Sequence, residues 1–246
     1  MKHQRGAALL IMLMIAGVLS AMFAIQLAGR GTSARAQVAD TTLVLSQARE
    51  ALIGFALVNG RLPRPAISGT NGVEAPVACA SDSICTGTLP WVTLGVNKLD
   101  SWGKALGYSV TKGFSQAGLA LTTVPTRKIQ TRNAAGALVF VKGSAAACVA
   151  AAAAAADVAT DCASAVLFSY GKMSFGITDA GAVQGNLSGP PATNLDEVTN
   201  STPTTLTFVQ RAANEDTAAP GGEFDDAVIW LSANVLLDRM QKAGKL

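Results

Sequence analysis

The sequence has only one histidine, His3, which stands before a long apolar run. The body of the chain therefore lacks the imidazole that Ser–His–Asp and Cys–His hydrolases use as general base. No P-loop and no G-x-G-x-x-G fingerprint is present. Ser169 to Lys172 matches the S-x-x-K pattern of penicillin-binding enzymes, but the S-D-N and K-T-G motifs that complete such a site are missing. We therefore expect that the protein is not an enzyme, an exported hydrolase included. We also expect that it needs no cofactor.

Charged residues are scarce as well, at 14%, and they nearly cancel to a formal net charge of +3. A nucleic-acid-binding surface needs a basic surplus, so we expect no nucleic-acid partner. Hydrophobic residues make up 50% of the chain, which excludes a disordered protein. A length of 246 residues is enough for a membrane segment followed by one domain with a substantial core.

The chain has four cysteines, Cys79, Cys85, Cys148 and Cys162, and no two of them form a CxxC pair. Without histidine ligands in the body, a zinc site would need all four thiolates at irregular spacings, so disulfides in an oxidising compartment are the better interpretation. Four cysteines allow three pairings. We favour the near-neighbour pairing, Cys79–Cys85 and Cys148–Cys162, because short loops close most readily.

One long apolar run, Ala7–Ala28, follows a short basic segment at the start of the chain. About 20 apolar residues span the hydrocarbon of a bilayer. Lys2 and Arg5 precede the run, which predicts a cytoplasmic N-terminus and a body on the other side of the membrane. Three roles are compatible with the run: a secretory signal cleaved after the small residues at 34–36, a plain anchor, or the first part of a longer helix.

The residues that follow favour the third role, because an amphipathic helical pattern continues to Gly60. Apolar and small residues recur at helical spacing: Val38, Leu45, Ala48, Leu52 and Ala56. Gly60 ends the pattern, and the prolines at 63 and 65 prevent the helix from resuming. Such a helix would pack first against the membrane or neighbouring chains and then against its own domain.

The remainder of the chain predicts strands and a final helix. Five segments rich in Val, Thr, Phe and Tyr are candidate strands: Leu106–Thr111, Gly118–Val124, Ala137–Lys142, Ala165–Tyr170 and Thr205–Gln210. Since no helical pattern separates most of them, we expect an antiparallel sheet. The fold class predicted is α+β, with the long N-terminal helix (a membrane part and an amphipathic part) packed on this sheet together with a C-terminal helix.

The C-terminal helix is predicted from a segment that begins acidic and ends basic. Either Ser232 or Asn234 is the expected N-cap, with lysines at the far end. We expect it to pack on the sheet through one set of apolar side chains: Ile229, Trp230, Val235, Leu236 and Met240.

Two segments carry a resemblance to a known family. QRGAALLIMLMIAGVL, at residues 4–19, resembles the N-terminal segment of type IV pilins and type II secretion pseudopilins. LDSWGKALGYSV, at residues 99–110, resembles the Asp-x-Trp-Gly…Tyr segment by which many pseudopilins enter their first strand. Its matching positions are Asp100, Trp102, Gly103 and Tyr108.

The resemblance implies how the chain is processed and divided. A prepilin peptidase would cut between Gly6 and Ala7 and methylate the new amino group of Ala7. Four parts are implied: a leader at 1–6, a transmembrane and filament-core helix at 7–28, its amphipathic extension at 29–60, and a periplasmic globular pilin-like domain at 61–246. The chain would reside in the bacterial inner membrane with a single pass, and at the cell surface if it is assembled into a pilus.

The resemblance also implies partners and a position in the assembly. The partners would be other pilin or pseudopilin subunits, the prepilin peptidase and the inner membrane. The family's usual glutamate at the fifth position after the cut is replaced by Ile11. A carboxylate at membrane depth is costly unless it pairs with the amine of a neighbouring subunit. Its absence favours a minor, tip or initiating subunit. The alternative is a membrane-anchored periplasmic binding domain that does not polymerise.

One acidic group is a weak candidate for a metal site. Glu223, Asp225 and Asp226 follow two glycines, and carboxylate oxygens on a glycine-hinged loop are ligands that calcium accepts. Major pseudopilins carry a calcium loop near the C-terminus, but its ligand pattern does not match this segment. We therefore expect no metal here and favour a solvated start of the C-terminal segment.

Overall fold

The computed structural model describes residues 35–150, 161–173, 175–185 and 193–246. The apolar run Ala7–Ala28, the cleavage position at Gly6 and Ala7, and Ile11 lie outside the described residues. The chain divides into two units, Met1–Asp40 and Thr41–Leu246. Among the described residues, one helix, Arg35–Asn59, is long and apolar enough to cross a membrane by length and composition.

The helix Arg35–Asn59 confirms the amphipathic pattern from Leu45 onward. Its core-facing stripe is fully buried: Leu45, Ala48, Leu52 and Ala56. Val38 is the exception, because 48% of it is exposed. Gly60 ends the helix with φ at +69°, and its N–H donates to the Ala56 carbonyl. Glycine adopts this left-handed conformation without steric cost.

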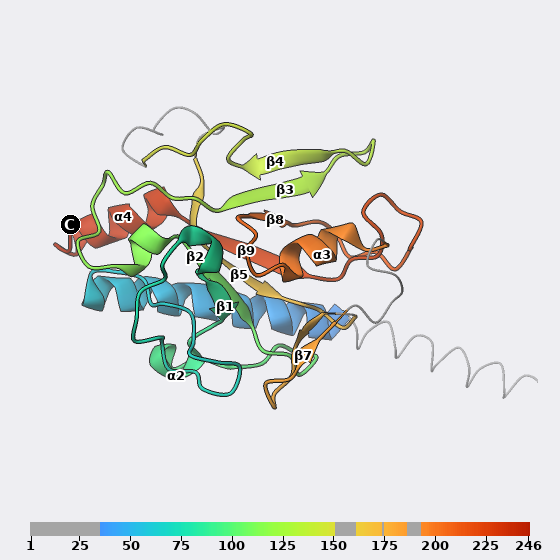
Figure 1. The fold of residues 1–246 in the computed structure, drawn as a ribbon, viewed down its shortest axis with the longest axis horizontal. Coiled ribbons are helices and arrows are strands. Elements are labelled where there is room, and N and C mark those ends of the chain that lie inside the picture. The colour runs from blue at the N-terminus through green and yellow to red at the C-terminus, as the bar shows by residue number, and fades with distance from the viewer. Residues whose placement is uncertain (1–34, 151–160, 174, 186–192) are drawn as a thin grey trace, which may run out of the picture. The chain divides into compact units, whose positions relative to one another are not determined.

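The first sheet has four antiparallel strands in the order β1-β2-β5-β9. Their bounds are β1 Thr86–Thr88, β2 Gly107–Val110, β5 Ala163–Ser169 and β9 Ala227–Ser232. The N-terminal helix lies across one face of this sheet (Figure 1). There it shares one core with Tyr108 of β2, Leu167 of β5 and Leu231 of β9. The expected arrangement of a helix packed on an antiparallel sheet is present.

A second sheet covers the other face of β5 and β9. Its order is β4-β3-β8, with β3 at Lys128–Arg132, β4 at Leu138–Lys142 and β8 at Thr207–Val209. Ile129 of β3 and Phe208 of β8 pack on Val166 and Phe168 of β5 in a second core. Every residue of β5 is therefore buried, because its alternate side chains enter two different cores.

The second sheet departs from the expectation of a purely antiparallel fold. β3 pairs with β4 antiparallel but with β8 parallel, in a register that places Ile129 beside Phe208. A parallel pair needs a long crossover connection. Here the crossover contains β4, β5, a small hairpin of β6 (Gly176–Ile177) and β7 (Val183–Gln184), and helix α3 (Leu195–Ser201).

Four of the five candidate strands are present, as β2, β4, β5 and β8. The prediction of a strand at Gly118–Val124 is wrong. That segment forms turns, in which Gly118 has φ at +82° and the Thr123 hydroxyl accepts from the Ala120 N–H. Leu121 and Val124 are exposed. Side-chain hydrogen bonding by threonine to the nearby backbone competes with strand formation.

The chain ends in helix α4, Ala233–Lys242, with Ser232 at the N-cap position as expected. Leu236 and Met240 are buried, but Val235 is 47% exposed and faces away from the core. Ile229 and Trp230 belong to strand β9 rather than to the helix. Residue 235 lies about 100° around the helix from 236, so the two cannot share one face. The remaining short helices are α2 (Trp91–Leu94) and two 3₁₀ turns, Asp82–Ile84 and Lys112–Ser115.

We predict that the buried stripe of the N-terminal helix is essential for stability. Leu52→Ala should lower the free energy of unfolding by about 2–5 kcal/mol, because it removes a fully buried side chain and leaves a cavity. Leu43→Ala, on the exposed side of the same helix, is the matched control and should change it by less than about 0.5 kcal/mol. Urea denaturation followed by circular dichroism measures both, and equal losses would contradict this packing.

Candidate functional site

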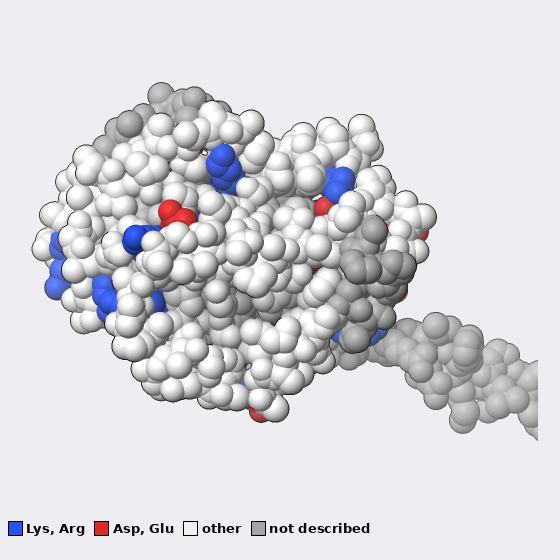
Figure 2. Space-filling model, in the orientation of Figure 1, with Lys and Arg blue, Asp and Glu red and all other residues white. Residues whose placement is uncertain are grey.

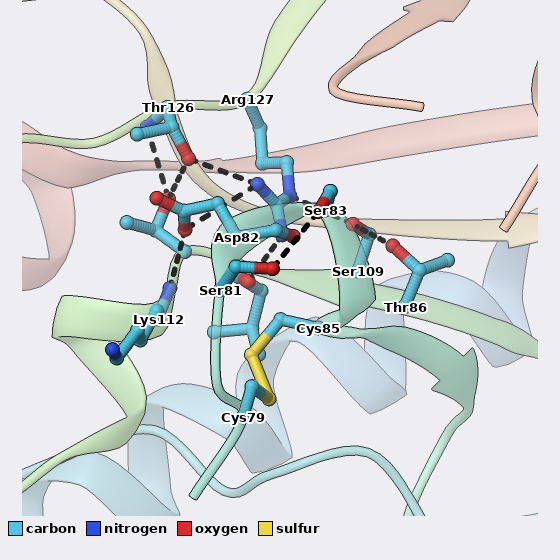
Figure 3. A network of polar contacts seen from close by, with 12 residues as sticks. Cys79, Ser81, Asp82, Ser83, Cys85, Thr86, Ser109, Lys112, Thr126 and Arg127 are labelled. Carbon is cyan, nitrogen blue, oxygen red and sulfur yellow. Dashed lines mark hydrogen bonds and ion pairs between the residues drawn. A yellow bond between two sulfur atoms is a disulfide. The ribbon is translucent and has the colours of Figure 1, made fainter. Parts of the chain in front are cut away.

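A buried arginine joins the two sheets. Arg127, which precedes β3, is fully buried. Its Nε donates to the Ser109 hydroxyl at 2.7 Å, and Nη1 donates to the Thr126 hydroxyl at 2.9 Å. Nη2 donates to the carbonyls of Asp82, at 2.8 Å, and Val110. Figure 3 shows Asp82, Ser109 and Thr126, from three segments of the chain, converging on the guanidinium. A buried charge needs this degree of compensation, since its desolvation costs several kcal/mol.

The first disulfide lies beside this arginine. Cys79–Cys85 closes a loop that contains the Asp82–Ile84 turn, and Figure 3 shows the sulfur bridge below Asp82. The Asp82 carboxylate lies 3.6 Å from Arg127 Nη1 and accepts from the Lys112 N–H at 2.7 Å. Burial lowers the pKa of Arg127 to about 10, against the opposing pull of Asp82. The arginine thus remains charged at neutral pH.

The second disulfide, Cys148–Cys162, ties the segment after β4 to the start of β5. Both bridges therefore follow the near-neighbour pairing. Lys142 at the end of β4 forms an ion pair with Asp161, next to the bridge. Each bridge holds a long connection against the first sheet, and such bridges stabilise by restricting the unfolded chain.

The Asp-x-Trp-Gly segment forms a single hydrogen-bonded turn. Asp100 Oδ1 accepts from the backbone N–H groups of Trp102 and Lys104, both at 2.9 Å, and Gly103 has φ at +77°. Asp100 Oδ2 accepts from the Ser169 hydroxyl at 2.6 Å. The hydroxyl of the S-x-x-K pattern is thus buried and engaged in positioning this turn at the end of β5. Tyr108, in β2, donates its hydroxyl to the Pro63 carbonyl at 3.0 Å.

Three carboxylates meet near the start of β9. Glu197 of α3, Asp225 and Asp226 place one oxygen each within 4.8 Å of the others. Glu223, proposed from the sequence as part of this group, is absent from it; its side chain is buried, and Oε1 has no partner. Sequence spacing finds neighbours along the chain, whereas α3 supplies a carboxylate from 28 residues away.

Backbone and amide donors already occupy much of this acidic cluster, which is formed by Glu197, Asp225 and Asp226. Asp225 Oδ2 accepts from the N–H groups of Lys172 and Met173, both at 2.8 Å. Asp226 Oδ2 accepts from the Asn200 amide at 2.9 Å, and Glu197 accepts from Asn194 at 2.7 Å and from the Asp225 N–H at 3.0 Å. Calcium takes about six to eight oxygens. The three side chains fit a cation only with several further ligands.

Burial also favours the protonated form of these acids. It raises the pKa of Glu197 to about 7, assisted by the charge of Asp225, and raises the pKa of Asp226 well above its ordinary range. The pKa of Asp225 is raised for the same reason. The Lys104 ammonium donates to the Met173 carbonyl at 2.7 Å, and burial lowers its pKa against the attraction of Asp225. Proton binding can therefore reduce the repulsion within the cluster.

A half-open cavity of about 420 Å³ lies between β1, the β6–β7 hairpin and the end of α3. Its apolar lining consists mainly of Tyr170, Phe175, Ile177, Val183 and Pro203. Apart from the Tyr170 phenol, none of the described residues that line it is ionisable. The cavity offers a place for an apolar group and no assembly of acid, base and nucleophile.

Charged side chains are few and scattered on the face that Figure 2 shows. This agrees with the low charged fraction of 14%. Comparisons of the chain with family models, with curated proteins and with solved structures found no match.

The buried arginine leads to a prediction on stability. Arg127→Met should lower the free energy of unfolding by about 3–5 kcal/mol, because it leaves Asp82 without its counter-charge and several buried acceptors without a donor. Arg49→Met, at a half-exposed helix position with one loose ion pair, is the control and should have little effect. Urea denaturation under non-reducing conditions tests this, and equal stability of the two variants would refute it.

The acidic cluster leads to a prediction on pH. The folded-state pKa of Glu197 is raised to about 7 from an ordinary value of 4.5. Its contribution to stability is therefore fully present below about pH 4.5 and is lost as the pH rises through about 7. The free energy of unfolding, measured with a chelator present, should fall between about pH 5 and 8.

Glu197→Gln should flatten that fall, because the amide cannot ionise. The exposed Glu215→Gln removes the same charge elsewhere and should follow the parent curve. Parallel curves for Glu197→Gln and the parent protein would contradict the raised pKa.

Proposed function

We propose that this chain is a minor pilin or pseudopilin, a structural subunit of a type IV pilus or a type II secretion pseudopilus that acts at the tip or in initiation. One observation carries the proposal. The described helix begins at Arg35, shortly after an apolar run of membrane-spanning length ends at Ala28, and its stripe from Leu45 to Ala56 is built into the core of an antiparallel sheet.

This arrangement suits a subunit that carries mechanical load. A plain anchor only has to hold the domain at the membrane, and it does not require its helix to be part of the domain core. Here the helix that follows the apolar run is one of the packed elements of the domain, and pulling it out would expose a fully buried stripe. A force on the apolar segment would therefore reach the sheet core through side-chain packing.

Two further features support an extracytoplasmic structural role. The two disulfides are typical of proteins exposed to an oxidising compartment, in agreement with the basic residues that precede the apolar run. The four residues that match the Asp-x-Trp-Gly…Tyr segment form one continuous region at the entry to β2. In this proposal Ile11, in place of the family's glutamate, assigns the chain to the tip rather than to the shaft.

The rival proposal is a membrane-anchored periplasmic binding domain that does not polymerise. The cavity of about 420 Å³ favours it, because its size suits a small apolar ligand. Under this proposal the helix would still connect the membrane to the domain, but the apolar run would remain a permanent anchor.

Processing of the N-terminus distinguishes the two proposals. When the full chain is produced with a prepilin peptidase, mass spectrometry should find a mature protein that begins with N-methylated Ala7. The Gly6→Leu variant should retain the leader, and Ala8→Leu, two positions further on, should be processed as the parent. An intact Met1 in the parent, or a mature start at Gln37, would overturn the pilin proposal.

A further inference from the structure

We propose that strand β4 is a pairing edge through which two copies of this chain associate, forming an antiparallel β4–β4 ladder with its two-fold axis at Val139. The inference goes beyond the proposed function and does not depend on it. β4 is an edge strand of the second sheet and lies at the top of the view in Figure 1.

Three consecutive side chains of β4 are apolar and exposed, and they lie on both faces of the strand. Leu138, Val139 and Phe140 are 42%, 38% and 37% exposed, in consecutive positions. Successive residues of a strand point to opposite faces, so both sides of β4 keep exposed apolar surface, although Val141 packs against the second core. A free edge of this kind is a template for pairing with another strand.

The hairpin register shows which backbone groups of β4 face outward. The Asn133 N–H donates to the Ala137 carbonyl at the β3–β4 turn. Hydrogen-bonded and non-bonded pairs alternate along an antiparallel ladder. Val139 therefore bonds inward to Thr131, and the N–H and C=O groups of Leu138 and Phe140 point away from the sheet. Among the described residues, no strand pairs with this outer side.

The opposite edge of the same sheet, at β8, has its backbone groups satisfied by a side chain. The two edges of the sheet therefore differ. On β8, the Asn200 side chain donates to the Val209 carbonyl at 2.8 Å and accepts from the Val209 N–H at 2.8 Å. One amide thus satisfies both edge groups of that residue. Among the described residues, no group bonds to the outward backbone groups of β4 in this way. The strand has no proline, and its one charged residue, Lys142, is already paired with Asp161. Natural sheets normally protect an edge by these means.

A second copy of β4 fits this edge in register, and the pairing brings no like charges together. With the axis at Val139, the outward groups of Leu138 meet those of Phe140 in the partner copy, and the two Val139 residues face each other. The apolar positions are then opposite apolar positions. Lys142 lies opposite Gly136 of the partner copy, so no like charges meet across the ladder. The two three-stranded sheets would become one of six strands.

Site-specific cross-linking of the full chain in detergent tests the geometry. The two Val139 residues would form a non-hydrogen-bonded pair with Cα atoms about 4.5 Å apart, within disulfide range. Val139→Cys should therefore give a covalent dimer on mild oxidation. Val183→Cys, 81% exposed on β7, is the matched control and should remain monomeric. The four native cysteines are all in disulfides and do not compete.

Charge at the axis provides a second, independent test. Light scattering after size-exclusion chromatography should show a monomer–dimer equilibrium for the parent chain. Val139→Lys would place two ammonium groups face to face and should abolish the dimer, whereas Val183→Lys should leave it unchanged, with circular dichroism confirming that both variants are folded.

Three results would overturn the inference. They are a parent chain that stays monomeric at all concentrations, a Val139→Lys variant that associates as the parent does, and a Val139→Cys variant that forms no more cross-linked dimer than Val183→Cys. A monomeric parent that binds an extended apolar peptide at this edge would likewise refute the second copy as its occupant.

Discussion

The burial of strand β5 on both faces is the constraint around which the rest of the domain is arranged. Ala165 and Leu167 enter the core shared with the N-terminal helix and α4, and Val166 and Phe168 enter the core beneath the second sheet. A strand buried on both sides must be covered by two layers, since neither face can be left to water. The helix, the first sheet and the second sheet therefore form three layers with β5 at the centre.

Buried polar groups between these layers have hydrogen-bond partners. Arg127 lies just before β3, and its guanidinium is bonded to three segments of the chain, one of which contains the Cys79–Cys85 bridge. At the other end of β5, Ser169 bonds to Asp100 and so positions the turn that leads into β2. The acidic cluster is the exception, because its carboxylates are buried together and proton binding lessens their repulsion. The domain thus combines a centre whose polar groups are paired with one acidic region, whose raised pKa values predict that stability falls as the pH rises.

These features support the proposal of a structural subunit that carries mechanical load. The helix that follows the apolar run is an integral part of the core, the connections are tied by disulfides, and the serine of the one catalytic-looking pattern is used to hold a turn. A pairing edge on β4 would add a second kind of contact between copies, made by backbone groups at the sheet rather than by the apolar segment at the start of the chain. The two kinds of contact would not compete, because they use different residues.

Elements whose signal is local could be predicted from the order of the residues alone. The helical stripe from Leu45 to Ala56, the strands at β2, β4, β5 and β8, and the short-loop disulfides all follow from spacing, propensity or loop closure within a few residues. Which distant segments meet could be seen only in the folded domain. The parallel pairing of β3 with β8, the entry of Glu197 into the acidic cluster in place of Glu223, and the compensation of Arg127 join residues far apart along the chain. Such contacts leave no periodic trace in a single sequence, because they are fixed by how the layers pack and not by the residues beside them.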